Sequence, residues 1–115
     1  MKLFVEAAAV GAGGFAGAIV RHLVVGITGS TVGIIAVNVA GCLVLGLLSQ
    51  DSKFALFAAT GFLGALTTFS ALSGHAVKLW TSGDGTTAAL FVLINVVAGL
   101  TAFTAGLYVR SQVAV

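Results

Sequence analysis

The sequence predicts an all-α membrane protein with four transmembrane helices per subunit, from its hydropathy, its charge content and the spacing of its polar clusters. Its mean hydropathy is +1.19, and 59% of its 115 residues are hydrophobic. A soluble domain has about a quarter charged residues, whereas this chain has 7%. Five basic and three acidic side chains cannot cover a water-facing surface, so lipid must solvate the apolar side chains.

The first span is expected at about residues 3–25. The opening "MKLFVEAAAVGAGG" resembles a signal peptide, but the apolar stretch continues past a typical hydrophobic region, which favours a span. Gly13, Gly17 and Arg21 follow at four-residue spacing, and "GAGGFAGA" predicts a small-residue surface for close helix packing. Arg21 either snorkels to the interface or faces an aqueous vestibule that attracts anions; the residues alone favour snorkelling.

The second span, at about residues 31–49, ends at the polar cluster "SQDSK". Asn38 lies within it, with Gly41 one turn on. An asparagine inside a membrane helix is costly unless it is paired, so Asn38 is either an interhelical hydrogen-bonding residue or a ligand donor. The single Cys42 excludes an intrachain disulfide framework and is expected to be a packing residue.

The third span, at about residues 54–80, contains the unusual stretch "GFLGALTTFSALSGH". Gly64 weakens a helix near the middle of this span, and a membrane helix breaks only where it is buried in protein or lines water. Freed carbonyls bind cations, whereas N–H groups and hydroxyls bind anions. A kinked, close-packed helix is the alternative. The candidate groups that would contact an ion are Thr67, Thr68, Phe69 and Ser70.

The fourth span is expected at about residues 86–109. It carries one stripe of small residues with a polar residue at its end, and a second stripe of hydroxyl-bearing residues on another face. The threonine hydroxyls could simply bond to carbonyls of their own helix, so the second stripe does not by itself indicate a site. The first stripe is Asn95, Gly99, Ala102 and Gly106, and the second is Thr101, Thr104 and Tyr108. Four spans nearly exhaust the chain, so residues 1–115 are predicted to form a single four-helix membrane domain without a soluble part.

The basic residues give almost no preference for one orientation in the membrane. Lys2, Lys53 and Arg110 would lie on one side, and Arg21 and Lys78 on the other. The orientation of short-looped membrane proteins follows the Lys and Arg bias. Either a partner or the insertion machinery therefore decides the topology, or the chain inserts both ways and pairs antiparallel.

Three blocks of this sequence resemble the signature blocks of the Fluc fluoride channels, which are also called CrcB-like proteins. They are "GGFAGAIVRH", "GIIAVNVAGCLVLG" and "GFLGALTTFSALSGH". Their order, their spacing and the total length fit the family, and the resemblance covers nearly the whole chain. The Thr-Thr-Phe-Ser block together with the span-two asparagine is its most specific part.

The resemblance implies an antiparallel, dual-topology dimer of four-helix subunits whose broken third spans cross at the centre. It implies a structural sodium ion there, held by the backbone carbonyls at Gly64 and Ala65. It also implies fluoride pores along the subunit interface and a vestibule arginine at Arg21. The pore and vestibule positions are Asn38, Phe69, Ser70, Thr67, Thr68 and Arg21.

Several positions depart from the family pattern. Ala71, Leu72 and His75 replace a threonine, a phenylalanine and a glutamate, and Gly99 and Phe103 stand where hydroxyls are usual. These departures favour a heterodimer with a homologous chain over a homodimer, because each pore would use both subunits.

The implied function is passive, electrodiffusive export of fluoride across a prokaryotic plasma membrane by a multi-pass protein. No reaction is catalysed, and the partners are fluoride, lipid and a second chain rather than nucleic acid. One alternative is a proton-coupled exporter of small cations, similar to the small multidrug-resistance proteins. That exporter needs a membrane-embedded carboxylate, for which Glu6 is the only candidate, near the start of span one. A non-conducting assembly subunit of a heterodimeric channel is the other alternative.

Overall fold

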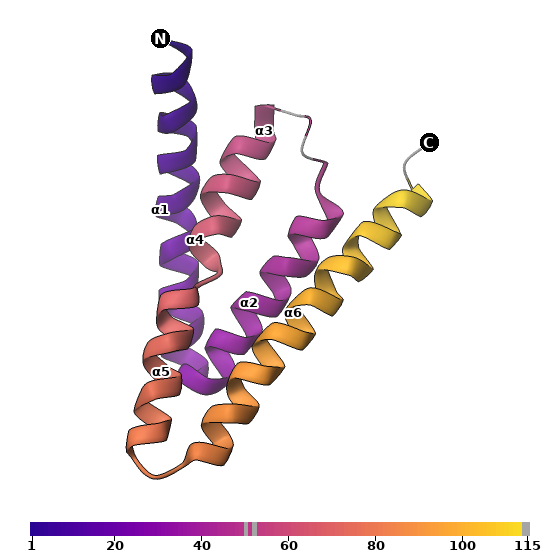
Figure 1. The fold of residues 1–115 in the computed structure, drawn as a ribbon. Helices are drawn as coiled ribbons and strands as arrows, with labels where there is room; N and C mark the ends of the chain where they lie inside the picture. The colour runs from indigo at the N-terminus through magenta and orange to yellow at the C-terminus, as the bar shows by residue number, and fades with distance from the viewer. Residues whose placement is uncertain (50, 52, 114–115) are drawn as a thin grey trace.

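The computed structural model describes residues 1–49, 51 and 53–113, and the elements among these residues are all helical. Figure 1 shows their arrangement. In chain order the elements are α1 (Lys2–Thr28), α2 (Ser30–Leu47), α3 (Lys53–Ala55), the π-helix η1 (Leu56–Leu63), α4 (Gly64–Leu66), α5 (Phe69–Thr81) and α6 (Gly85–Val113).

Four helical stretches are long and apolar enough to cross a membrane. They are α1, α2, α6 and the composite stretch Lys53–Thr81, which contains α3, η1, α4 and α5. The prediction of an all-helical, multi-pass membrane protein with four spans is confirmed, and the expected spans agree with these bounds to within a few residues. That the whole chain forms one domain stays a prediction.

The four stretches pack mainly as two pairs. α1 packs along η1 and α4, and α2 packs along α6, while α5 contacts α6. In Figure 1 the two pairs lie close together near the turn between α1 and α2 and diverge toward the end that holds both termini. The composite third stretch therefore packs on α1 through η1 and α4, and on α6 through α5.

The turn between α1 and α2 and the turn between α5 and α6 are short, and each has a glycine where the backbone reverses. Gly29, with a φ of 91°, ends α1 and begins α2, and Gly83, with a φ of 89°, lies between α5 and α6. Only glycine adopts this left-handed region without strain. The Asp84 carboxylate accepts a hydrogen bond from the Thr87 N–H (3.2 Å) at the start of α6, as an N-terminal cap does.

The small-residue surface of α1 allows the contact with η1. A Cβ atom on Gly13 would overlap the Phe57 carbonyl oxygen and lie 2.9 Å from the Phe62 nitrogen, and one on Gly17 would overlap the Phe62 carbonyl oxygen. Only glycine permits this approach of two backbones. The close packing predicted from "GAGGFAGA" is confirmed for these two glycines.

The first stripe of α6 faces α2 in the same way. A Cβ atom on Gly106 would lie 2.9 Å from the Gly46 Cα, and one on Gly99 would lie 3.5 Å from the Cys42 Sγ. Asn95 is buried beside them. The second stripe, made of Thr101, Thr104 and Tyr108, is exposed. The two stripes predicted from spacing thus have different environments.

The apolar core is small, and many large apolar side chains face outward. Ile34, Leu72 and Phe91 join α2, α5 and α6 in one buried cluster, and a second cluster joins α2 to η1 and α4. Phe15 is 72% exposed on α1, and Leu100 is exposed on α6. Such an apolar outer surface agrees with solvation by lipid.

Candidate functional site

The backbone of the third stretch leaves helical geometry at Thr67 and Thr68. α4 ends at Leu66, Thr67 has φ −80° and ψ 148°, and Thr68 has φ −150° and ψ 118°. Gly64, where the sequence suggested the weak point, is helical with φ −61° and ψ −35°. The interruption lies beyond the glycine because Asn38 of α2 supplies hydrogen-bonding partners for the Thr68 backbone.

Asn38 supplies those partners from α2. Its Oδ1 accepts a hydrogen bond from the Thr68 N–H (2.7 Å), and its Nδ2 donates to the Thr68 carbonyl (3.3 Å). The same Nδ2 donates to Asn95 Oδ1 (2.9 Å). Both N–H groups of the amide are therefore used within the chain, and the residue is only 8% exposed. Asn38 therefore forms interhelical hydrogen bonds, which a buried asparagine in a membrane helix requires.

Asn95 completes this network from α6, and the sequence reasoning did not place it in the site. Its Nδ2 donates to the Phe91 carbonyl one turn earlier (2.8 Å), which leaves its Oδ1 facing Asn38. Asn95 is 5% exposed. Two asparagines within different apolar spans could have indicated the pair, because each needs a partner away from water.

The threonine and serine hydroxyls near the interruption have different roles. The Thr67 hydroxyl donates to the Leu63 carbonyl (2.9 Å). The Thr68 hydroxyl accepts from the Ala71 N–H (3.0 Å), which caps α5, and lies 3.2 Å from the Ser70 hydroxyl. Since the Thr67 proton is used within its own helix, Ser70 is the hydroxyl best placed to turn toward a ligand.

The opposite side of the interruption is open. Phe69 is 80% exposed, and Ser70 and Gly64 are exposed as well. Of the predicted pore residues, Asn38 and Thr68 are thus buried and Thr67 is half-buried, while Phe69 and Ser70 lie on the surface.

Arg21 reaches the third stretch from α1. Its Nε donates to the Ala65 carbonyl (3.0 Å), and the side chain is partly buried. The snorkelling favoured by the residues alone is not what this geometry shows: the guanidinium binds a backbone carbonyl of a neighbouring helix and lines a cavity.

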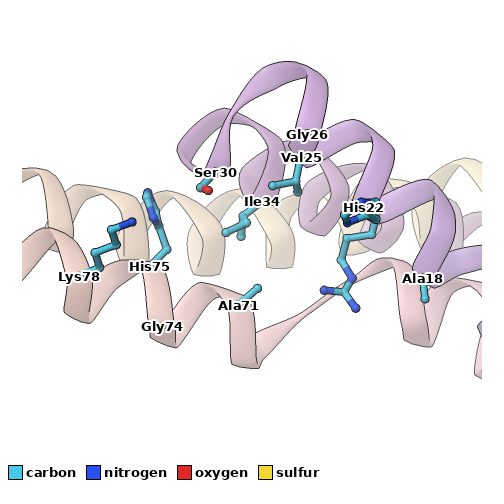
Figure 2. Close-up of a pocket in the computed structure, with 11 residues that line it drawn as sticks. Ala18, His22, Val25, Gly26, Ser30, Ile34, Ala71, Gly74, His75 and Lys78 are labelled. Atoms are coloured by element: carbon cyan, nitrogen blue, oxygen red, sulfur yellow. The ribbon is translucent and has the colours of Figure 1, made fainter.

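This cavity has a volume of about 650 Å³ and lies between α1, α5 and the start of α2. Figure 2 shows His75 and Lys78 on α5 along one part of its wall, with His22 on α1 farther along. With Arg21 the lining includes two permanent cations and two imidazoles. Such a lining favours anions over cations.

His75 is held in place by two contacts. Its Nε2 lies 2.7 Å from the Thr31 hydroxyl of α2, and its ring meets the Phe91 ring edge-on at a centroid distance of 5.0 Å. The sequence marked His75 only as a departure from a family pattern. Its pairing with Thr31, 44 positions away in the chain, had no local signal.

The other departures from the family pattern have mixed environments. Ala71 lines the cavity, whereas Leu72 is buried against Ile34 and Phe91. Gly99 is buried beside Cys42. Leu72 and Gly99 are therefore explained by packing within the chain itself.

The sequence matches the model of the family described as "CrcB-like protein, Camphor Resistance (CrcB)" over residues 8–107. It is also similar to curated proteins that carry the name "Fluoride-specific ion channel FluC". The protein from Methanocaldococcus jannaschii is 46% identical over 76% of this chain and 80% of the relative. The one from Paracoccus denitrificans is 42% identical over 70% of each chain. The one from Rhizobium johnstonii is 32% identical over 96% of this chain and 99% of the relative.

Proposed function

This chain belongs to the CrcB-like protein family, and on that premise we propose that it is a subunit of a fluoride-selective channel in a prokaryotic plasma membrane. It exports fluoride passively: the ion accumulates in the cytosol after hydrogen fluoride enters and dissociates, and the membrane potential drives it out. The proposal depends on the similarity to proteins named as fluoride-specific ion channels, which extends over most of the chain.

The geometry supports an anion path along the outer side of the interruption. The basic cavity at Arg21 concentrates the anion near the protein. Phe69 can then offer its positive ring edge, and the Ser70 hydroxyl can donate a hydrogen bond in place of water. Asn38, on the buried side of the interruption, holds the Thr68 backbone extended, so that the Phe69 and Ser70 side chains face outward.

The proposal includes an antiparallel dimer in which the interrupted third stretches cross. Within one chain the side that carries Gly64, Phe69 and Ser70 has no cover, and a second copy or homologue would supply it. The nearly balanced distribution of basic residues supports insertion in both orientations.

A structural sodium ion at this crossing fits the backbone of the interruption. The Gly64 carbonyl loses its usual helical donor, because the Thr68 N–H donates to Asn38 instead. The Ala65 carbonyl accepts only from Arg21 among the side-chain donors of the described residues, which leaves a lone pair for a cation. The Gly64 and Ala65 carbonyls of each of two chains would hold the ion. The bound ion would stabilise the contact between the two third stretches.

The heterodimer remains part of the proposal in a narrower form. Leu72 and Gly99 are explained by the chain's own packing. Ala71 and His75 line the cavity and Phe103 is half-buried on α6, so these three departures are the ones that a homologous second chain would complement.

The cation-exporter alternative needs a carboxylate within the membrane. Glu6 lies in the second turn of α1 and pairs with Lys2 (Nζ–Oε1 3.7 Å). A carboxylate near a helix end, beside a lysine, is poorly suited to exchange a proton for a cation at the membrane centre.

The test is fluoride efflux from liposomes that contain the purified chain, alone and with a co-expressed homologue. A fluoride channel releases fluoride without a proton gradient and keeps its activity in Glu6→Gln, whereas a proton-coupled exporter loses activity in that variant. An assembly subunit gives no flux alone and full flux only when the homologue's own pore residues are intact.

A further inference from the structure

The cavity between α1 and α5 has an excess of positive charge. α1 contributes Arg21 and His22, and α5 contributes His75 and Lys78. In Figure 2 His75 and Lys78 lie near each other on α5, and His22 lies farther along on α1. The groups come from two helices far apart in the sequence, so the fold gathers them.

No carboxylate compensates these charges. The three acidic residues of the chain are Glu6, Asp51 and Asp84, and none of them lines the cavity. The Arg21 Nε donates to a carbonyl, which leaves the terminal nitrogens available. Among the described residues the only ion pair is at the opposite end of α1. The cavity therefore needs anions from solution to balance its charge.

The cavity is much larger than one fluoride ion. Its volume of about 650 Å³ equals the liquid volume of on the order of twenty water molecules. A tetrahedral oxyanion with part of its hydration shell fits such a space. Its several oxygens can accept hydrogen bonds from a guanidinium, an ammonium and imidazoles together, which a single halide cannot do.

We infer that this cavity binds a polyatomic oxyanion of the sulfate or phosphate class, and that the bound oxyanion competes with fluoride for entry. The competition rests on the proposed function, but the binding does not. An oxyanion held by Arg21, whose Nε donates to the Ala65 carbonyl beside the interruption, would occupy the position from which fluoride moves toward the interruption.

The permanent charges of the cavity lining are both positive. They are Arg21 on α1 and Lys78 on α5. The helices that pack on His75 contribute uncharged partners, the Thr31 hydroxyl from α2 and the Phe91 ring from α6. The charge that an oxyanion would meet in the cavity is therefore positive.

Sulfate is the probe for the test, since its several oxygens can each accept a hydrogen bond. Calorimetry on the purified, folded protein at constant pH and ionic strength should show sulfate binding. Lys78→Gln removes one permanent charge from the cavity lining and should weaken sulfate binding roughly threefold or more.

Lys53→Gln is the matched control, because it removes the same charge at the opposite end of the molecule. An equal loss of binding in Lys53→Gln and Lys78→Gln, or no binding by the folded wild-type protein, would overturn the inference. Fluoride efflux with and without sulfate then tests the competition: sulfate should slow the efflux, and unchanged efflux at a sulfate concentration that saturates the calorimetric site refutes it. Absence of efflux without sulfate contradicts the proposed function alone.

Discussion

The two faces of the interruption between α4 and α5 differ in how their polar groups are satisfied. The inner face consists of Thr68, its partner Asn38, and Asn95, which is bonded to Asn38; all three are buried and hydrogen-bonded within the chain. The outer face consists of Gly64, Phe69 and Ser70, all exposed. The inner face is complete in a single chain, whereas the outer face presents an aromatic ring and a hydroxyl to whatever lies outside.

This difference distinguishes residues that stabilise the fold from residues that could contact the transported ion or a second chain. Groups whose hydrogen bonds are used within the chain position the backbone, and groups that are still free can meet an ion or a second chain. Inner-face substitutions should therefore change both the unfolding free energy and fluoride flux, while outer-face substitutions should change flux or association alone. Four substitutions test this division, in order of decreasing effect on unfolding.

Asn38→Asp should have the largest effect. The carboxylate can still accept from the Thr68 N–H, but it has no donor for the Thr68 carbonyl or for Asn95 Oδ1 and places a charge at a buried site. We expect a loss of about 3 kcal/mol or more in unfolding free energy and loss of fluoride efflux. Denaturant titration in detergent and liposome efflux measure the two. Thr101→Ala, on the exposed stripe of α6, is the control, and a stable but non-conducting Asn38→Asp would instead make Asn38 a direct ion contact.

Thr68→Val should have the next largest effect. It keeps the backbone bonds to Asn38 but removes the hydroxyl that caps the Ala71 N–H and contacts Ser70. Loss of a helix cap costs about 1 kcal/mol, and efflux should fall without disappearing because the interruption itself persists. Thr67→Val is the comparison, since its hydroxyl only bonds back to Leu63; equal losses in the two variants would contradict a special role for the cap.

Gly64→Val should leave the unfolding free energy of the monomer within about 0.5 kcal/mol, because the nearest atom to an added Cβ within the chain is the Ala59 carbonyl oxygen at 3.8 Å. If a second chain packs on the outer face, the same substitution should weaken association. Analytical ultracentrifugation in detergent measures the shift toward monomer. Gly11→Val, where an added Cβ meets nothing within 4 Å, should not shift it.

Phe69→Ala should have the smallest effect on unfolding. The ring is 80% exposed, so its removal leaves no cavity, and a surface substitution changes stability by about 0.5 kcal/mol or less. Fluoride efflux should nevertheless fall at least tenfold if the ring edge contacts the ion, a change worth about 1.4 kcal/mol. The comparison is Phe15→Ala, which removes a similarly exposed aromatic ring on α1. Unchanged efflux in Phe69→Ala would remove the Phe69 ring from the path.

Much of the fold followed from the sequence because it depends on local properties. The four spans follow from runs of apolar residues between polar clusters, and the glycines of α1 follow from their helical spacing. A break near Gly64 was expected, but which residues leave the helix did not follow. Gly64 has the weaker intrinsic preference for a helix, yet Thr67 and Thr68 are the extended residues.

The candidate site was predicted residue by residue but not in its arrangement. Asn38, Thr68 and Ser70 do gather near the interruption, whereas Asn95 was noted only as part of a stripe. A membrane asparagine signals that a partner exists but not which one, since any buried polar group on a neighbouring helix could satisfy it. The Thr31–His75 pair gave even less signal, because a histidine with an exposed surface needs no partner at all.

The sequence by itself determined that lipid solvates this protein and that four helical stretches are able to cross the membrane. Hydropathy and helical spacing are properties of residues that are neighbours in the sequence. The tertiary structure alone decided where the third stretch opens and which groups face outward. The reason is that a backbone leaves the helix where its freed N–H and carbonyl groups find partners. Here those partners are on Asn38, 30 positions away from Thr68, a distance along the chain that only packing can close.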